Sequence, residues 1–174
     1  MVRIIAGYFK GQLLNTNNSP NLRPTRDRVK ETLFSILGNI EDLSVADLFA
    51  GSGNLGLEAI SRGAKSCVFV ENDPKQIKII YENAARLNVA EDIEVRKIDV
   101  VRYLVNPADF NLILADPPYQ YRHYDNLFEA FGRLSAGTRI ALESGIELQI
   151  PSHFSAKIKS QRQISETKLT IFRV

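Results

Sequence analysis

Short apolar segments alternate with helical patterns along most of the chain. Near-continuous apolar runs, rich in β-branched and aromatic residues, have the composition of buried strands; they cover 45–49, 66–71, 93–98, 110–115 and 138–143. Apolar residues that recur three and four positions apart predict helices over 54–62, 74–88 and 124–134. Because strands that read as unbroken apolar runs are covered on both faces, these repeated units predict a mostly parallel sheet between two layers of helices.

The end of the chain follows a different pattern. Residues 157–164 and 168–174 alternate between apolar and polar positions with no helical segment between them. This pattern predicts an antiparallel hairpin at the edge of the sheet. With the five preceding runs, it predicts seven strands in a Rossmann-like α/β fold.

The start of the chain forms a separate unit in this interpretation. Residues 3–6 and 12–14 predict a small hairpin, and apolar spacing over 25–37 predicts a helix, in which Glu31 and Phe34 are expected to fix the helix against the rest of the protein. We therefore expect an N-terminal basic extension over residues 1–38 and an α/β domain over residues 39–174.

Composition adds few constraints. The chain has 174 residues, of which 44% are hydrophobic and 24% charged, as in an ordinary soluble globular protein. The single cysteine, Cys67, lies within an apolar run, which predicts a buried structural thiol and excludes an internal disulfide. No apolar stretch has transmembrane length and no signal peptide is recognisable, so we expect a cytoplasmic monomer without membrane or metal partners.

The charges are distributed unevenly. Residues 1–32 carry six basic and two acidic residues, and residues 157–174 carry five and one, so each end has a net charge of +4. Residues 33–156 carry the remaining 11 basic and 17 acidic residues, a net charge of −6. Basic ends around an acidic centre favour a polyanion bound at the periphery, with other chemistry inside.

A glycine motif, Gly51-Ser52-Gly53-Asn54-Leu55-Gly56, lies between the first predicted strand of the sheet and the first helix. In this position it is typical of two ligand classes, a nicotinamide or flavin dinucleotide and S-adenosylmethionine. The predicted strand ends separate the two, because Asp47, Glu71, Asp99 and Asp116 lie at or just beyond four of them. Carboxylates converging there would repel a pyrophosphate but suit a sulfonium, an ammonium group, ribose hydroxyls and an amino group.

S-adenosylmethionine is therefore the predicted cofactor, and each position has an expected role. Gly51 and Gly53 allow close backbone approach, Glu71 binds the ribose hydroxyls, and Asp99 binds the adenine amino group. Asp47 either orders the glycine loop or meets the methionine ammonium. The full predicted set of cofactor-binding residues is Asp47, Phe49, Gly51, Gly53, Glu71, Asn72, Asp99 and Asp116.

The segment Asp116-Pro117-Pro118-Tyr119 follows the apolar run 110–115. Its carboxylate and a backbone carbonyl left available by proline can accept hydrogen bonds from an exocyclic amino group, and its tyrosine can stack on a planar base. Asp116, Pro117 and Tyr119 are accordingly the candidate catalytic residues. The alternative is an ordinary proline turn at a strand end.

These motifs together resemble a known family. Asp47–Gly53 with Asp116–Tyr119 is similar to class I methyltransferases that modify exocyclic amines, and Arg3–Gly7, Leu22–Phe34 and Leu48–Ala59 narrow the resemblance to the RsmD family. Members of that family are bacterial enzymes that methylate N2 of a guanine in 16S ribosomal RNA. The resemblance implies that residues 39–174 are an S-adenosylmethionine-dependent methyltransferase domain whose partner is 16S ribosomal RNA or the small ribosomal subunit.

The basic extension and the loop after Tyr119 supply the candidate RNA contacts: Arg3, Lys10, Arg23, Arg26, Arg28, Tyr121 and His123. For Arg26 and Asp27 an intramolecular role in closing the cofactor pocket is an equal alternative. Rival functions are methylation of DNA adenine N6 or of a protein glutamine amide, an RNA-binding assembly factor without activity, and a nucleotide-dependent oxidoreductase.

Overall fold

The computed structural model describes residues 2–16 and 24–174, with the side chains of residues 24–26 left aside. The strands are β1 (Val2–Arg3), β2 (Leu13–Leu14), β3 (Ser44–Leu48), β4 (Ser66–Glu71), β5 (Ile93–Lys97), β6 (Leu112–Ala115), β7 (Arg139–Gly145), β8 (Ile158–Ile164) and β9 (Thr167–Arg173). The helices are α1 (Pro24–Leu37), α2 (Asn54–Ser61), α3 (Pro74–Leu87), α4 (Val100–Tyr103), α5 (Tyr124–Phe131) and α6 (Ser152–Ser155).

Within these residues, seven strands form the main sheet in the order β5-β4-β3-β6-β7-β9-β8. Strands β5, β4, β3, β6 and β7 pair in parallel, whereas β9 runs antiparallel to both β7 and β8. The predicted seven-stranded, mostly parallel sheet with a C-terminal antiparallel hairpin is therefore confirmed. The chain leaves β3 toward β4 on one side and later returns to β6 on the other, so the strand order reverses between β3 and β6. Ligands bind at such a reversal in open α/β sheets.

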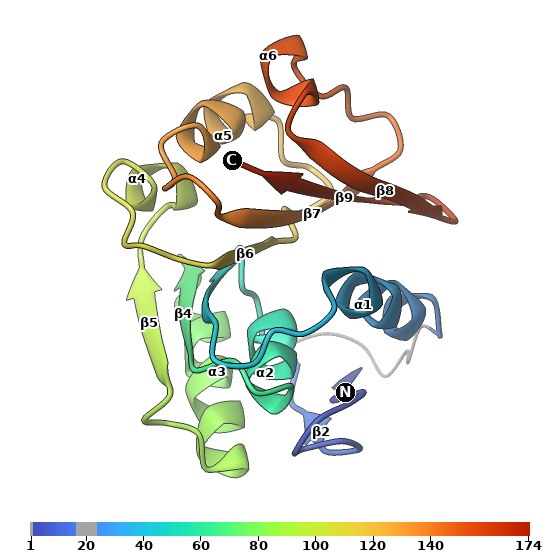
Figure 1. Cartoon of the computed structure of the whole chain (residues 1–174). Coiled ribbons are helices and arrows are strands. Elements are labelled where there is room, and N and C mark those ends of the chain that lie inside the picture. The colour runs from blue at the N-terminus through green and yellow to red at the C-terminus, as the bar shows by residue number, and fades with distance from the viewer. Residues whose placement is uncertain (1, 17–23) are drawn as a thin grey trace.

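Helices cover both faces of the sheet (Figure 1). Helices α1, α2 and α3 lie on one face of the sheet, and α4 and α5 lie on the other. Since alternate residues of a strand point to opposite faces, the central strands contribute side chains to the core on both sides. In β3, for example, Val45 packs into the first hydrophobic cluster and Ala46 into the second. Both clusters are closed to solvent, as the near-continuous apolar strands predict.

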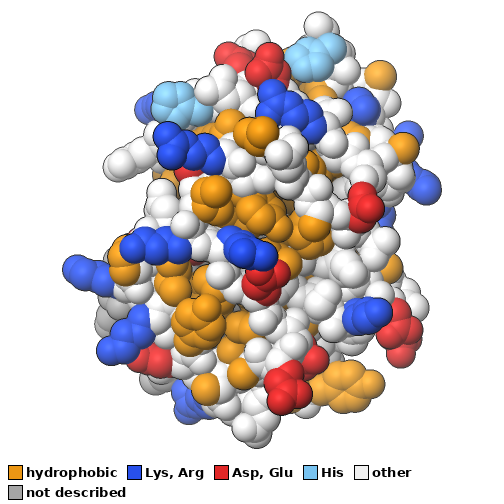
Figure 2. All heavy atoms as spheres, turned by 90° about the vertical axis from the view of Figure 1, so that its left-hand side faces the viewer, with side chains coloured by type: hydrophobic (Ala, Val, Ile, Leu, Met, Phe, Trp, Pro, Cys, Tyr) orange, Lys and Arg blue, Asp and Glu red, His pale blue; other side chains and the backbone are white. Residues whose placement is uncertain are grey.

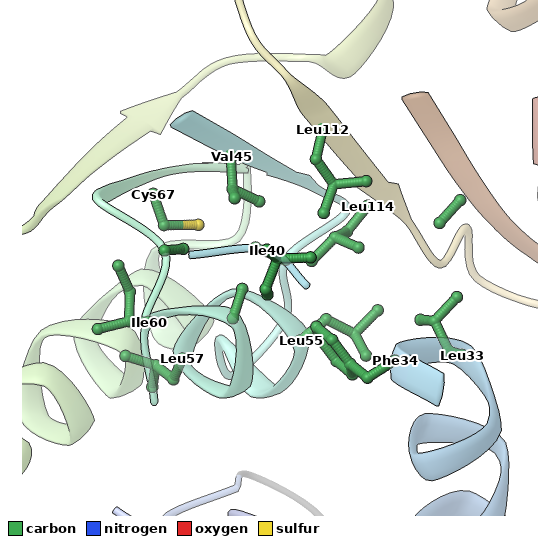
Figure 3. Close-up of a cluster of buried hydrophobic side chains, with 14 of the residues drawn as sticks. Leu33, Phe34, Ile40, Val45, Leu55, Leu57, Ile60, Cys67, Leu112 and Leu114 are labelled. Carbon is green, nitrogen blue, oxygen red and sulfur yellow. The ribbon is translucent and has the colours of Figure 1, made fainter. Parts of the chain in front are cut away.

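The first cluster joins the extension to the domain. Figure 3 shows Leu33 and Phe34 of α1 pointing toward Leu55 of α2 and Leu114 of β6. Phe34 therefore has the expected anchoring role, but Glu31 is exposed, and its expected role is wrong because it lies on the solvent face of α1. The shared core makes the extension part of one packed body, and the boundary at residue 38 stays a prediction.

Most predicted elements differ from the observed ones only at their ends. The short helices α4 and α6 were not expected, because four residues are too few to show a helical period. Cys67 is 1% exposed, as predicted, and burial raises the pKa of its thiol well above the ordinary value. Among the described residues, no helix is long and apolar enough to cross a membrane.

Strand β5 forms one edge of the sheet, on the side of the molecule that Figure 2 shows. Hydrophobic side chains gather at the centre of this view, and lysine and arginine side chains surround them. The strand itself carries the exposed residues Glu94, Arg96 and Lys97, and Glu94 forms an ion pair with Arg96. Charged side chains on an edge strand disfavour pairing with another strand.

Candidate active site

The glycine loop connects β3 to α2 through a turn with left-handed backbone. Phe49, Gly51 and Gly53 have φ values of 60°, 54° and 82°. A residue with a Cβ is strained in this region, so glycine suits the two later positions. No atom outside the adjacent chain lies within 4 Å of a Cβ placed on Gly51, so this side of the loop is open to a ligand.

Hydrogen bonds hold the loop along its length. The Gly51 N–H donates to Glu71 Oε2 at 2.8 Å, and the Gly53 N–H donates to the Ala50 carbonyl at 2.8 Å. At the start of α2, the Gly56 N–H donates to Asp47 Oδ2 at 2.8 Å. The loop is therefore ordered before any ligand binds.

Asp47 lies beneath this loop, with 2% of its surface exposed. Burial raises the pKa of its carboxyl well above 3.8; the hydrogen bond from Gly56 acts in the opposite direction, and the negative charges of Asp116 and Glu71 raise it further. Of the two roles expected for Asp47, the loop-ordering contact is present in the structure.

Glu71 ends β4 next to the loop. Besides Gly51, its carboxylate accepts the N–H groups of Asn72 at 2.8 Å and Asp73 at 2.9 Å. Asn72 itself is exposed and contributes its backbone to this arrangement. A carboxylate held by three backbone donors has a fixed position at the strand end, where a ribose would lie if the cofactor bound as predicted.

Asp99 follows β5 and caps α4. Its Oδ1 accepts the N–H of Arg102 at 3.1 Å, and the residue is exposed. This capping bond uses one lone pair of a carboxylate that has several, so the other oxygen can still accept a hydrogen bond from a ligand.

The Asp116–Tyr119 turn lies beside the glycine loop because of strand register. Leu48 of β3 pairs with Ala115 of β6, so Asp116 leaves the sheet next to Phe49. Pro117 is buried, whereas Asp116 is exposed and Tyr119 is 80% exposed. The Tyr121 N–H donates to the Pro118 carbonyl at 2.7 Å, and no backbone N–H of the described residues donates to the Pro117 carbonyl. The expected amine-binding groups therefore share one edge of the sheet with the glycine loop.

Tyr121 turns inward, unlike Tyr119. Its ring centroid lies 5.0 Å from that of Phe49, 5.1 Å from that of Tyr124 and 6.0 Å from that of His123. Its hydroxyl is buried, with no hydrogen-bond partner among the described residues. Burial, together with the charge of Asp99, raises the pKa of Tyr121 to about 12. Its predicted RNA contact stays a prediction.

The candidate RNA contacts of the extension differ in their surroundings. Lys10 and Arg28 are exposed, whereas Arg3 donates through Nε to Asp27 Oδ2 at 3.1 Å, which ties the hairpin to α1. Arg23, and the side chain of Arg26, lie outside the part that the structure describes. Asp27 thus has an intramolecular partner in the hairpin, and the two alternatives for Arg26 and Asp27, RNA contact and closure of the cofactor pocket, stay predictions.

A buried ionic cluster centred on Glu58 of α2 was missed by sequence reasoning. Its carboxylate lies 3.1 Å from Lys30 Nζ and 2.8 Å from Arg62 Nε, and it also accepts the N–H groups of Ile5 at 2.8 Å and Ala6 at 3.1 Å. Glu58 is 0% and Lys30 2% exposed. Burial lowers the pKa of Lys30 against the opposing effect of Glu58. The cluster joins the hairpin and α1 to the helix that carries the glycine loop.

One sequence signal could have revealed this cluster. Helix α2 is apolar on nearly every side, as Leu55, Leu57, Ala59 and Ile60 show. A helix of this kind is covered all round, so a glutamate within it must be buried and paired. The identity of its partners, however, depends on how the extension packs.

These residues fit S-adenosylmethionine. Carboxylates lie at or just beyond the carboxyl ends of four adjacent parallel strands, Gly51 leaves one side of the loop open, and acceptors for an amino group lie beside it. No group of three or more potential metal ligands occurs in the described residues. The strand order and this site define the class I methyltransferase fold.

Comparison with known proteins gives the family. Residues 2–173 match the model of the family described as Conserved hypothetical protein 95, which is the RsmD family, and the chain belongs to it. The chain is 32% identical to YlbH of Bacillus subtilis (strain 168) over 93% of its own length and 92% of that protein. It is 37% identical to ribosomal RNA small subunit methyltransferase D of Escherichia coli (strain K12) over 87% and 78%. The solved structure of yhhF from Escherichia coli superimposes with a TM-score of 0.84, at 30% identity, covering 99% of this chain and 97% of that one.

Proposed function

We propose that this protein transfers the methyl group of S-adenosylmethionine to the exocyclic N2 of a guanine in 16S ribosomal RNA. The observation that carries the proposal is the position of Asp116–Tyr119 beside the glycine loop, where the strand order reverses. Membership of the family, and the similarity to ribosomal RNA small subunit methyltransferase D of Escherichia coli, support RNA as the substrate.

When bound, S-adenosylmethionine supplies an electrophilic methyl group on a sulfonium. The chain's own residues have to make the amine reactive, because the lone pair of guanine N2 is delocalised into the ring. Hydrogen bonds from N2 to the Asp116 carboxylate and the Pro117 carbonyl favour a pyramidal nitrogen and direct its lone pair at the methyl carbon. Asp116 is also placed to accept the proton that the nitrogen loses.

The base has to leave its RNA context to reach this edge of the sheet. Tyr119 offers an exposed ring on which a base turned out of a single-stranded loop can stack. His123 is exposed close to Tyr121, which supports a role for these two residues as one wall of the base site.

The basic extension supplies contacts that position RNA without reading its sequence. Lys10 and Arg28 present exposed charges, and Arg3 is 57% exposed in its side chain although it pairs with Asp27. Phosphate contacts of this kind make affinity depend strongly on salt. A ribosomal substrate would place the protein in the cytoplasm, and a monomer is sufficient for this site.

Two other functions remain as competitors. The amine-binding turn would also suit adenine N6 or a glutamine amide, and an assembly factor would keep the RNA-binding surface without the reaction. The intact acceptors at Asp116 and Pro117 favour an enzyme over an assembly factor.

The test uses small ribosomal subunits from a strain that lacks this gene, incubated with the protein and methyl-labelled S-adenosylmethionine. We expect the label in N2-methylguanosine after digestion of the 16S RNA to nucleosides. Label in another nucleoside or in protein would refute the guanine assignment. Binding of subunits with no transfer would instead support the assembly factor.

A further inference from the structure

Asn83 of α3 is a buried polar residue outside every motif described above. It is 0% exposed, and both ends of its side-chain amide form hydrogen bonds. Its Nδ2 donates to the Ser52 carbonyl at 3.0 Å and to the Asn15 carbonyl at 3.1 Å, and its Oδ1 accepts the Asn15 N–H at 2.7 Å. One side chain therefore joins the glycine loop to the extension.

The contact with Ser52 fixes a peptide at the centre of the loop. The carbonyl of the Ser52–Gly53 peptide points to Asn83, and the N–H of the same peptide donates to the Ala50 carbonyl at 2.8 Å. With both polar groups paired, this peptide cannot rotate without breaking a hydrogen bond in a buried setting. Asn83 thus holds the loop between the glycines that are expected to approach the cofactor.

The contact with Asn15 fixes the extension where its hairpin ends. Asn15 follows β2 directly and forms two hydrogen bonds with Asn83, in the manner of a strand pair. The hairpin has a second anchor on α2, where Ser61 Oγ donates to the Ala6 carbonyl at 2.6 Å and accepts the Phe9 N–H at 3.0 Å. Ser61 is also 0% exposed, but no hydrogen bond joins it to the glycine loop.

We propose that Asn83 is a positioning residue that couples the docking of the extension to the geometry of the cofactor loop. Any RNA contact that stabilises the docked extension then stabilises the loop conformation that binds the cofactor. Because coupling between two binding sites is reciprocal, the cofactor strengthens RNA binding by the same factor. This inference rests on the proposed cofactor and RNA partner.

The experiment compares three proteins, the wild type, Asn83→Leu and Ser61→Ala, by titration calorimetry with S-adenosylhomocysteine. The measurements are made at a temperature at which circular dichroism shows each protein fully folded, so that lost stability does not appear as lost affinity. We expect Asn83→Leu to weaken binding about tenfold, which is the size of coupling typical between linked sites. Ser61→Ala removes one anchor of the extension but leaves the Asn83 bonds to Ser52 and Asn15 and the Glu58 bonds to the hairpin in place, so the affinity is expected to stay unchanged.

A second measurement tests the coupling itself. Binding of labelled small subunits is measured with and without S-adenosylhomocysteine, and we expect at least about fivefold tightening in the wild type and in Ser61→Ala. In Asn83→Leu the ratio of the two affinities is expected to fall to about one. If Asn83→Leu does not fold, Asn83→Asp replaces it, because it keeps the size and the Oδ1 acceptor but loses the donor to the two carbonyls.

Equal S-adenosylhomocysteine affinity in the wild type and the Asn83 variant would refute the positioning role. If S-adenosylhomocysteine does not change the affinity of the wild type for small subunits, the coupling is refuted. A wild-type protein that binds no S-adenosylhomocysteine would instead refute the proposed function, which is a separate result from either of these.

Discussion

The glycine loop and the Asp116–Tyr119 turn leave neighbouring strands of one sheet, yet their surroundings are opposite. The loop is held at Gly51 by Glu71 of β4, at Ser52 by Asn83 of α3, and at Gly53 by a hydrogen bond within the loop. The turn presents an aspartate and an aromatic ring to solvent, and only its first proline is buried. For the proposed function, this difference means that the cofactor side is ordered by the fold before binding, whereas the acceptor side is completed when the base binds.

This division has a physical reason. A loop that has to fit one small molecule gains affinity when it is ordered in advance, because no conformational entropy is lost on binding. A turn that receives a base from a large RNA needs open access, and its two prolines limit its freedom without blocking it. The comparison can be tested at both regions.

The largest effect is expected at the open turn. Asp116→Ala removes the carboxylate that accepts hydrogen bonds from the amine, so methyl transfer is expected to fall by roughly 10²–10³-fold, as with loss of one transition-state hydrogen bond. Binding of S-adenosylhomocysteine, measured by calorimetry, is expected to change little. If the variant loses S-adenosylhomocysteine binding to the same degree as methyl transfer, Asp116 belongs to the cofactor site and not to the acceptor site.

The next effect concerns packing beneath the loop. A Cβ added to Gly56 would lie 2.3 Å from Phe69 Cε1 and 2.7 Å from Cys67 Sγ. Gly56→Ala is therefore expected to lower the free energy of unfolding by about 1–3 kcal/mol, as in other overpacked cores.

Urea denaturation measures this loss. Gly145→Ala is the matched control, because no atom lies within 4 Å of a Cβ at that position. It is expected to change the free energy of unfolding by less than about 0.5 kcal/mol. Equal losses in the two variants would mean that close packing under the loop is not the cause.

A smaller effect depends on pH and concerns Asp47. Because burial raises the pKa of this carboxyl above 3.8, the folded state holds its proton at pH values where the unfolded state has lost it. The contribution of Asp47 to stability is therefore full below pH 3.8 and is lost as pH rises toward the pKa of the folded state.

Asp47→Asn keeps the acceptor for the Gly56 N–H but cannot ionise. The free energy of unfolding of this variant relative to the wild type is expected to increase above pH 3.8, by at most about 1.4 kcal/mol per pH unit. Urea denaturation across a pH series measures the difference. A constant difference would show that Asp47 titrates alike in both states.

The smallest effect is expected at Tyr121, between the two regions. Its buried hydroxyl lacks a partner among the described residues, so Tyr121→Phe is expected to leave stability unchanged or to raise it by less than about 1 kcal/mol. The same variant should remove a tyrosine that titrates near pH 12, visible in the ultraviolet absorbance of tyrosinate. A destabilised variant would indicate a hydrogen bond that the hydroxyl forms in solution.

Much of the fold could be predicted because each strand and helix has a local pattern. Strand β4 was predicted with its observed bounds, and the cap of α3 by Asp73 follows from local chemistry, with a hydrogen bond from the Lys75 N–H at 2.9 Å. The inward contact of Tyr121 with Phe49 could not be predicted, because it depends on the path of a loop between two elements.

The candidate site shows the same limit. The glycines and acidic strand ends were found because parallel strands bring their carboxyl ends to one edge. The buried Lys30–Glu58 pair and the bonds of Asn83 were not found, because each joins segments distant in sequence: Asn83 and Asn15 are 68 residues apart, and Lys30 and Glu58 are 28 apart. A contact between segments so distant in sequence leaves no local pattern from which it could be predicted.

By itself, then, the sequence determined the class of sheet and the place of the glycine loop, and it placed the Asp116–Tyr119 turn at the end of a buried strand. The spacing of hydrophobic residues, helix caps and turn residues each depend on a few neighbouring positions, so they can be recognised in the sequence. Tertiary structure alone decided that the extension is joined to helix α2 through Glu58 and to the glycine loop through Asn83. Burial gives these polar groups their importance, and burial exists only once distant segments have packed together.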